Sequence, residues 1–143
     1  MARLTIYSQD LADKICAELA NGYSLRTVCK AEDMPCKATI FNWLRTHKEF
    51  LDQYARAKTE SVDTLVDDMI DIADDATNDW MEVHGEDGSV IGYKLNGEHI
   101  QRSKLRIDTR KWLAIKLQPK KYGDKQQIEQ SGEVKVIGLS GRF

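Results

Sequence analysis

The sequence has few cysteines, and their spacing excludes the usual zinc-binding arrangements. Its 143 residues include three cysteines, at Cys16, Cys29 and Cys36. No two of them form a CxxC pair, and no histidine lies at zinc-ligand spacing from them. We therefore expect small buried thiols in a reducing compartment, with no bound metal.

Long apolar runs and common catalytic motifs are also missing. No stretch approaches the roughly 18 apolar residues that a membrane-spanning helix requires, and no secretory signal is recognisable. There is no GxxxxGKS/T phosphate loop, no GxSxG elbow and no HExxH pair. These absences predict a cytosolic protein that is not an enzyme and that needs no cofactor.

A large excess of positive charge is missing as well, because the formal net charge is -2. This argues against a protein that wraps DNA in the manner of histones. The charges are instead segregated: no Lys or Arg lies between Lys58 and Lys94, acidic residues crowd between Asp63 and Asp87, and basic residues dominate from Lys94 to Lys125. Such blocks predict that the two segments face each other, or face different partners.

The acidic block could in principle hold a metal ion. Carboxylates four residues apart share a helix face, and a nuclease would use such a pair to bind Mg²⁺. These acids are spread around much of the helix, however, and no His or Lys is placed as a base. We interpret the block as a solvated or intersubunit face. Its members are Asp67, Asp68, Asp71, Asp74 and Asp75.

The N-terminal part of the chain carries three short helical patterns. The first begins after Ser8 and stops at Gly22, and the second follows Ser24. The third runs over about residues 36–46, with Pro35 at its opening. Two helices separated by a tight, proline-marked turn are typical of a helix-turn-helix.

The third helix has an apolar inner face and a small, polar and basic outer face. Ile40 and Trp43 lie inward, whereas Asn42 and Arg45 lie outward. This mix suits a helix that reads DNA, because an amide can bond an adenine edge and a cation can bond guanine or phosphate. A helical bundle with a solvated face is the alternative interpretation. The candidate DNA-binding residues are Lys30, Lys37, Thr39, Asn42, Arg45 and Lys48.

A long amphipathic helix is predicted to follow. From Phe50 as far as Ala76, apolar residues recur at intervals of three and four. A second long helix is predicted over about residues 97–117, where Pro119 ends it. The two should pack antiparallel, with the acidic edge of one matched to the basic edge of the other. Their apolar faces are too extensive for a single pair of helices to cover.

Two short strand patterns separate the long helices, and a third lies near the C-terminus. Residues 80–84 and 90–95 flank a Gly-Glu-Asp-Gly turn, which predicts a small β-hairpin. Near the end of the chain, Val134, Val136 and Ile137 alternate in a Gly/Ser setting. This terminal strand has no partner strand in a helical monomer, so we expect it to pair between subunits.

Together these patterns predict a mainly α chain in three parts. A helix-turn-helix DNA-binding domain covers residues 1–52. A central oligomerisation domain over residues 53–118 contains the antiparallel pair of long helices and the β-hairpin. A C-terminal strand and tail cover residues 119–143.

The segment 107–125, IDTRKWLAIKLQPKKYGDK, resembles a recurring motif of the small terminase subunits of tailed double-stranded DNA phages, in particular that of a short-tailed Shigella phage. The stretch TIFNWLRTHKEF leading into YARAKTE is similar to the same family. The two parts together cover most of residues 8–125.

The resemblance implies a viral DNA-packaging factor of the host cytoplasm. Subunits of that family form a ring through a central helical domain, here expected to contain about eight copies. Peripheral helix-turn-helix domains bind the packaging-start sequence of the double-stranded viral DNA, and a C-terminal segment contacts the large terminase subunit, which holds the ATPase and nuclease. A dimeric helix-turn-helix transcription regulator, and a structural adaptor that binds no DNA, remain the alternatives.

Overall fold

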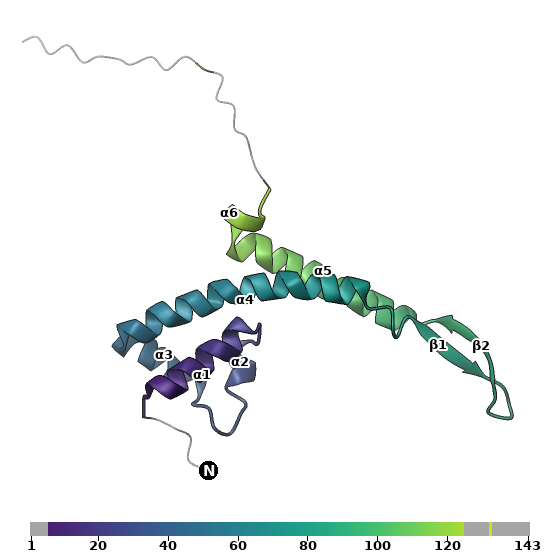
Figure 1. Ribbon diagram of the computed structural model, residues 1–143, viewed down its shortest axis with the longest axis horizontal. Helices are drawn as coiled ribbons and strands as arrows, with labels where there is room; N and C mark the ends of the chain where they lie inside the picture. The colour runs from purple at the N-terminus through teal and green to yellow at the C-terminus, as the bar shows by residue number, and fades with distance from the viewer. Residues whose placement is uncertain (1–5, 125–131, 133–143) are drawn as a thin grey trace, which may run out of the picture.

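The computed structural model describes residues 6–124 and Gly132, so the predicted strand at Val134, Val136 and Ile137 lies outside the described residues. The protein is mainly α, with one two-stranded antiparallel sheet, as predicted (Figure 1). Its elements are α1 (Gln9–Ala20), α2 (Leu25–Val28), α3 (Lys37–Thr46), α4 (Lys48–Asp74), β1 (Trp80–His84), β2 (Val90–Leu95), α5 (Gly97–Leu117) and α6 (Pro119–Tyr122).

The first two helices begin and end where the sequence signals place them. The Ser8 hydroxyl accepts a hydrogen bond from the Leu11 amide at 3.2 Å, and the Ser24 hydroxyl accepts one from the Thr27 amide at 3.2 Å. Gly22 follows α1 at a φ of 91°, a conformation that only glycine adopts without strain. These local bonds satisfy backbone groups that the helix ends leave open.

The start of the third helix differs from the prediction. Pro35 does not open α3 but lies before it, with its side chain fully buried. Cys36 is the N-cap residue, in an extended conformation, and the helix begins at Lys37. The proline therefore fixes the chain entering the turn and packs inward, instead of occupying the first helical position.

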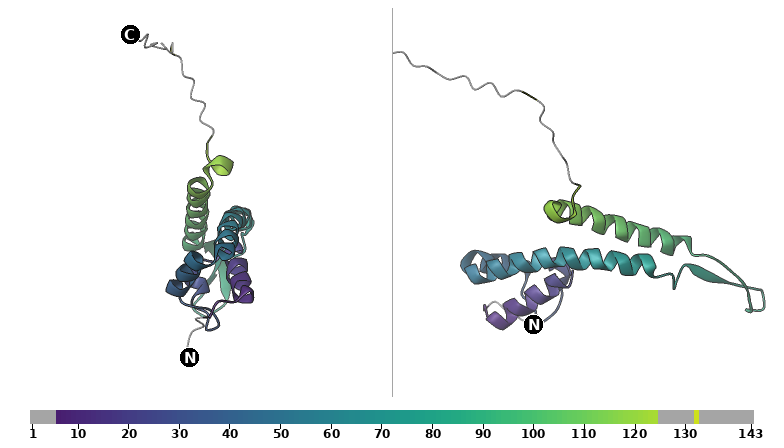
Figure 2. Two further views of the ribbon diagram at one scale, coloured as in Figure 1. Left: turned by 90° about the vertical axis from the view of Figure 1, so that its left-hand side faces the viewer. Right: turned by 45° about the horizontal axis from the view of Figure 1, so that its top comes forward.

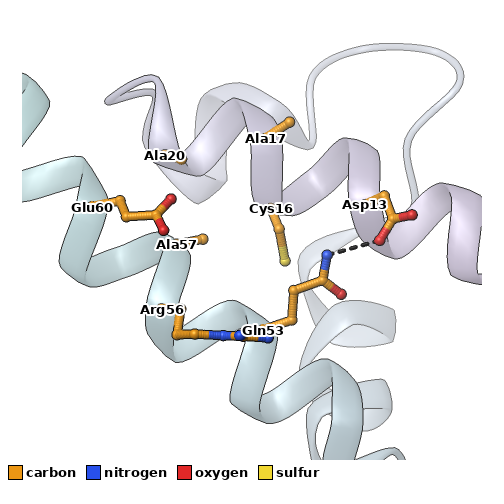
Figure 3. Close-up of a pocket in the computed structure, with 8 residues that line it drawn as sticks. All are labelled: Asp13, Cys16, Ala17, Ala20, Gln53, Arg56, Ala57 and Glu60. Atoms are coloured by element: carbon orange, nitrogen blue, oxygen red, sulfur yellow. Dashed lines mark hydrogen bonds between the residues drawn. The ribbon is translucent and has the colours of Figure 1, made fainter.

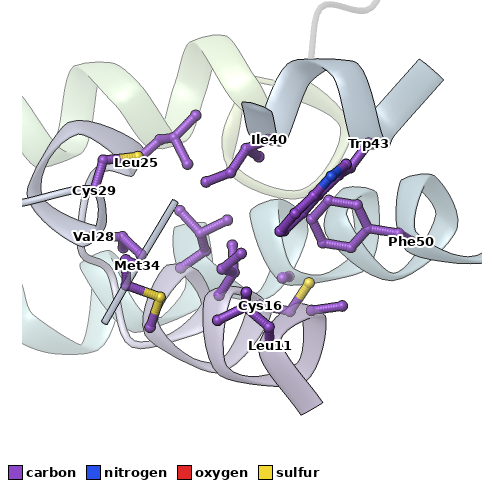
Figure 4. Close-up of a cluster of buried hydrophobic side chains, with 13 residues drawn as sticks. Leu11, Cys16, Leu25, Val28, Cys29, Met34, Ile40, Trp43 and Phe50 are labelled. Carbon is purple, nitrogen blue, oxygen red and sulfur yellow. The ribbon is translucent and has the colours of Figure 1, made fainter. Parts of the chain in front are cut away.

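The hydrophobic core lies among α1, α2, α3 and the N-terminal half of α4 (Figure 4). Ile15, Ile40 and Phe50 are fully buried, and Trp43 is 3% exposed. Each such side chain contributes about 1.5–3 kcal/mol by its burial. The core comprises Leu11, Ala12, Ile15, Cys16, Leu19, Leu25, Val28, Cys29, Met34, Ile40, Trp43, Phe50 and Ala57.

Helix α4 joins the two regions of the chain, because it crosses residue 52 without a break. At its start it is tied to α1: the Gln53 amide donates to Asp13 at 2.8 Å (Figure 3). Further along, the Thr64 hydroxyl donates to the carbonyl of Ala20 at 2.7 Å. The first half of this helix is therefore part of the N-terminal core, and the second half extends beyond it (Figure 1).

Helices α4 and α5 pack antiparallel, which confirms the predicted helical hairpin (Figure 2). The end of α5 returns to the middle of α4, where the Gln118 side chain donates to the carbonyl of Thr59 at 2.8 Å. Helix α6 is held at the same place by one carboxylate. The Tyr122 hydroxyl donates to Asp63 at 2.6 Å and the Lys121 ammonium donates to it at 2.8 Å.

The predicted contact between the acidic and the basic segment is found at two positions in the described part of the chain: Asp63 pairs with Lys121 of α6, and one pair joins the long helices themselves. Arg110 Nε lies 3.6 Å from Asp68 Oδ2, and this is the one ion pair between α4 and α5 in the described part of the chain. The packing of the two helices instead uses mainly small and apolar side chains, such as the buried Ala114. Most acidic and basic side chains of the pair therefore point to solvent.

The connection between the long helices is the predicted β-hairpin. Helix α4 ends at Asp74, earlier than the apolar pattern suggests, because the Asp75 carboxylate accepts from the Thr77 amide at 3.0 Å and turns the chain. Strands β1 and β2 then pair antiparallel from Trp80 opposite Leu95, and the ribbon projects beyond the helix ends (Figure 1).

The second region has almost no buried core. Among the described residues after Val62, only Ala114 is buried. No helix within residues 6–124 is both long enough and apolar enough to cross a membrane. The large apolar side chains exposed in this region are Ile70, Trp80, Met81, Val90, Ile91, Tyr93, Leu95, Ile100, Leu105, Trp112 and Leu117.

Candidate nucleic-acid interface

Aromatic packing fixes the orientation of α3 at its junction with α4. The Tyr7 ring stacks on His47 with 3.8 Å between ring centroids, and meets the edge of Trp43 at 5.4 Å. Phe50, in the first turn of α4, lies 6.5 Å from Trp43. Because Trp43 and Ile40 are buried, the opposite side of α3 must face solvent.

The outer face of α3 is a single stripe of exposed residues. Ala38, Phe41, Asn42 and Arg45 lie at intervals of three and four, and all four are exposed. Lys37 extends over the Phe41 ring, with its ammonium 5.5 Å from the centroid. The stripe thus presents an amide, a guanidinium, an ammonium and apolar surface, which are the groups that contact bases and phosphates in a major groove.

The structure brings together some of the predicted residues and separates others. Lys37, Asn42 and Arg45 share the outer part of α3. Thr39 is half-buried on another side, where its hydroxyl lies 3.2 Å from Cys36 Sγ. Lys30 lies in the turn after α2 and Lys48 opens α4, and both are exposed. These two lysines therefore belong to the segments that precede and follow α3 and are not part of its outer face.

Sequence reasoning gave little weight to the apolar part of this surface. Phe41 is 43% exposed and Leu51 is 46% exposed, and both line a hollow beside Arg45 that Ala38 and Leu44 complete. Helical periodicity could have identified both residues as exposed, because Phe41 falls on the outer stripe of α3 and Leu51 is one residue away from the inward Phe50. A large apolar residue on a solvent face indicates a contact surface when it lies beside polar groups.

One of the acidic residues near the helix-turn-helix is neutralised within the chain. The Lys14 ammonium lies 2.7 Å from the Asp33 carboxylate. The hydrogen bond and the charge of Lys14 lower the pKa of Asp33, so this carboxylate is ionised and paired at neutral pH. The pair reduces the repulsion that Asp33 would exert on a phosphate backbone.

The buried Cys16 thiol is not suited to nucleophilic chemistry. Burial raises the pKa of the Cys16 thiol to about 11, which leaves it protonated and poorly nucleophilic at neutral pH. This thiol lines a hollow between α1 and α4 with Asp13 and Arg56 (Figure 3). Within the described part of the chain, no three His, Cys, Asp or Glu side chains are grouped as metal ligands.

Comparison with known proteins identifies close structural relatives. Three solved structures of variants of the terminase small subunit gp1 of the bacterial virus Sf6 match with TM-scores of 0.62, 0.63 and 0.63. Their sequence identities are 34%, 32% and 32% over 92%, 94% and 94% of this chain. The alignments cover 93%, 100% and 100% of the Sf6 chains. A search of the curated proteins finds no match.

A protein-family model gives the same result over nearly the whole chain. The model described as "Bacteriophage Sf6, terminase small subunit-like" matches residues 7–129. This range includes the helix-turn-helix, both long helices and the segment 107–125 on which the resemblance was based. The chain therefore belongs to the family of phage terminase small subunits represented by that of bacteriophage Sf6.

Proposed function

We propose that this terminase small subunit is a packaging factor that recognises the packaging-start sequence of double-stranded viral DNA. It assembles as a ring and presents the DNA to the large terminase subunit, which supplies the ATPase and nuclease. The observation that supports DNA binding is the exposed outer stripe of α3, where the side chains of Asn42 and Arg45 are exposed, as is that of Lys37. Family membership supports the packaging role.

DNA contact by one subunit should be weak and strongly salt-dependent. The whole chain has a formal net charge of -2, so attraction to phosphates comes only from local cations such as Lys37, Arg45, Lys30 and Lys48. Each phosphate contact releases counterions, and the affinity falls as the salt concentration rises. A ring that carries several helix-turn-helix modules would raise the overall affinity by avidity.

The experiment that tests this surface reverses two charges on α3. The variant Lys37→Glu/Arg45→Glu should abolish the gel shift of packaging-start DNA at moderate salt, while native mass spectrometry shows an unchanged oligomer. A matched control, Lys58→Glu/Lys94→Glu, changes the net charge equally at exposed positions outside α3 and should retain binding. Binding that survives in the α3 variant would show that DNA contacts another surface.

The C-terminal segment has two proposed roles, intersubunit strand pairing and contact with the large terminase subunit. Both can be tested by truncation after Gln130, which removes Val134, Val136 and Ile137. We expect a ring of about eight subunits in the full chain, and a less heat-resistant ring of variable number after truncation. The truncated chain should also bind the large subunit more weakly. An unchanged subunit number and melting temperature would exclude the strand from assembly.

We further propose that the subunit has no ATPase or nuclease activity of its own. The sequence contains no phosphate loop, and the described residues hold no metal-ligand group beside a base. Purified protein should therefore show only background turnover of ATP and of DNA, with and without Mg²⁺. Activity that copurifies with the protein through a second, orthogonal column would contradict this.

A further inference from the structure

The solvent side of α4 carries an acidic stripe in the part of the helix beyond Thr64. Asp67, Ile70, Asp71 and Asp74 lie three or four residues apart and therefore share one face. We call this set the acidic stripe. Ile70 is 61% exposed, and none of the three carboxylates forms an ion pair with another described residue. Three unpaired carboxylates thus surround an exposed isoleucine.

The solvent side of α5 carries a stripe of the opposite sign. Arg102, Leu105, Trp112 and Lys116 recur at three, seven and four residues and share one face, which we call the basic stripe. Leu105 is 65% exposed and Trp112 is 59% exposed. Arg102 pairs at 3.0 Å with Glu98, an exposed residue of the same face, so Lys116 is the cation of the stripe that forms no ion pair with the described residues. Apolar surface again lies between charged ends.

The two stripes cannot meet within one chain. Helices α4 and α5 contact each other through different faces, as the approach of Arg110 to Asp68 at 3.6 Å and the burial of Ala114 show. By helical periodicity the basic stripe lies on the side of α5 opposite the buried Ala114, and the acidic stripe lies on a different face of α4 from Asp68. The helical hairpin is a pair of helices lying side by side (Figure 2), and each stripe occupies exposed positions of one of them.

We propose that the acidic stripe of one subunit docks on the basic stripe of the next copy of this chain. The inference rests on the proposed ring and names the surfaces that would form it. Ile70 would pack against the exposed part of Leu105 and Trp112, while the carboxylates meet the cations at the rim. Docking two basic stripes, or two acidic ones, would place like charges together, which disfavours a symmetric dimer. A contact between unlike surfaces repeats around a ring until it closes.

The first arm of the test reverses each stripe separately. The acidic-stripe variant is Asp67→Lys/Asp71→Lys/Asp74→Lys, and the basic-stripe variant is Arg102→Glu/Lys116→Glu. All five positions are exposed, so circular dichroism should show wild-type helix content in both. Native mass spectrometry at fixed concentration should show at least about a tenfold loss of the ring in each variant, because like charges now face each other.

The second arm restores the complementarity. The acidic-stripe variant carries two basic stripes, and the basic-stripe variant carries two acidic stripes. Mixed in equal amounts, the two variants should therefore form rings in which they alternate. A single chain with all five substitutions should also form rings by itself. If the substitutions had only damaged the fold, neither mixing the variants nor combining the substitutions would restore the ring.

A matched control and the wild-type chain separate the possible failures. The control Asp10→Lys/Glu32→Lys/Asp52→Lys has the same net charge as the acidic-stripe variant, at exposed positions near the N-terminus, and should still form rings. Rings that persist in either stripe variant, or no recovery on mixing, would overturn the stripe contact while the ring itself stands. A wild-type chain that stays monomeric, or forms only dimers, would overturn the ring and the stripe contact together.

Discussion

The N-terminal region and the distal helical hairpin are built from similar amphipathic helices, yet they use their apolar residues in opposite ways. In the first region, α1, α2 and α3 close around α4, and Trp43 is 3% exposed. In the second region, two helices lie side by side, no third helix of the described residues encloses a core with them, and Trp112 is 59% exposed. The difference teaches that two helices form a layer and that enclosing a core requires more.

The comparison also suggests separate tasks for the two regions. A region that encloses its own core holds α3 in a fixed orientation, as the proposed contact with DNA requires. A side that leaves Leu105, Trp112 and Ile70 exposed provides surface for neighbours. The four predictions below test this division, from the largest expected effect to the smallest.

Removal of the buried tryptophan should be the most damaging change. Trp43→Ala empties a site that contacts Tyr7 and Phe50, with centroid distances of 5.4 Å and 6.5 Å. We expect the free energy of unfolding to fall by about 3–5 kcal/mol, measured by denaturant titration. A loss below about 1 kcal/mol would show that the N-terminal core does not depend on this side chain.

The matched change in the second region should act on assembly instead of folding. Trp112→Ala removes a mostly exposed side chain, so helix content by circular dichroism should stay at the wild-type level. The ring fraction in native mass spectrometry should fall, because apolar area that neighbours bury contributes about 25 cal/mol per Å². Lys94→Ala, an exposed change in β2, serves as a control. An unaltered ring would remove Trp112 from the interface.

A smaller effect should appear at α6, where Asp63 holds the end of the second region against α4. Hydrogen bonds from Lys121 and then Tyr122 lower the pKa of Asp63. A carboxylate whose pKa is lowered by folding stabilises the folded contact, here between α6 and α4, at pH values above its pKa in the unfolded chain. This contribution is lost as the pH falls through its pKa in the folded chain. The Tyr122 and Gly123 amide signals in nuclear magnetic resonance should therefore shift with acidification below the usual aspartate range.

The Asp63→Asn variant should show the shifted amide signals already at neutral pH and should lose their acid dependence. Asp87→Asn is a suitable control, since the pKa of Asp87 is also lowered, by Ser89, but in the turn between β1 and β2. If Asp63→Asn retained the wild-type acid transition, another group would hold α6.

The smallest effect is expected for the surface ion pair of the N-terminal region. Lys14 and Asp33 are 2.7 Å apart, but their side chains are 62% and 57% exposed. Exposed pairs contribute little because water and salt screen them. Lys14→Met should leave the denaturant midpoint within experimental error, in contrast to Trp43→Ala. A clear shift of the midpoint would show that charge, as well as burial, holds this region together.

The sequence by itself determined the elements of this protein. The Ser8 and Ser24 caps, the glycine at position 22 and Pro119 predicted the ends of helices correctly, and the Gly-rich turn predicted the β-hairpin. It also identified the exposed positions of Asn42 and Arg45 on α3. These features depend on the backbone within a few residues, where capping and helical periodicity act.

Only the tertiary structure decided which faces meet. The sequence suggested that acidic and basic edges would pair between the long helices, but in the described part of the chain one residue of α5, Arg110, forms an ion pair with α4, and Ala114 of α5 is buried. The tertiary structure also directs the Thr39 hydroxyl toward Cys36, away from the predicted DNA surface, and brings Asp63 within hydrogen-bond distance of Tyr122. The rotation of one helix against another depends on how side chains distant in sequence fill the space between them, which no local pattern records.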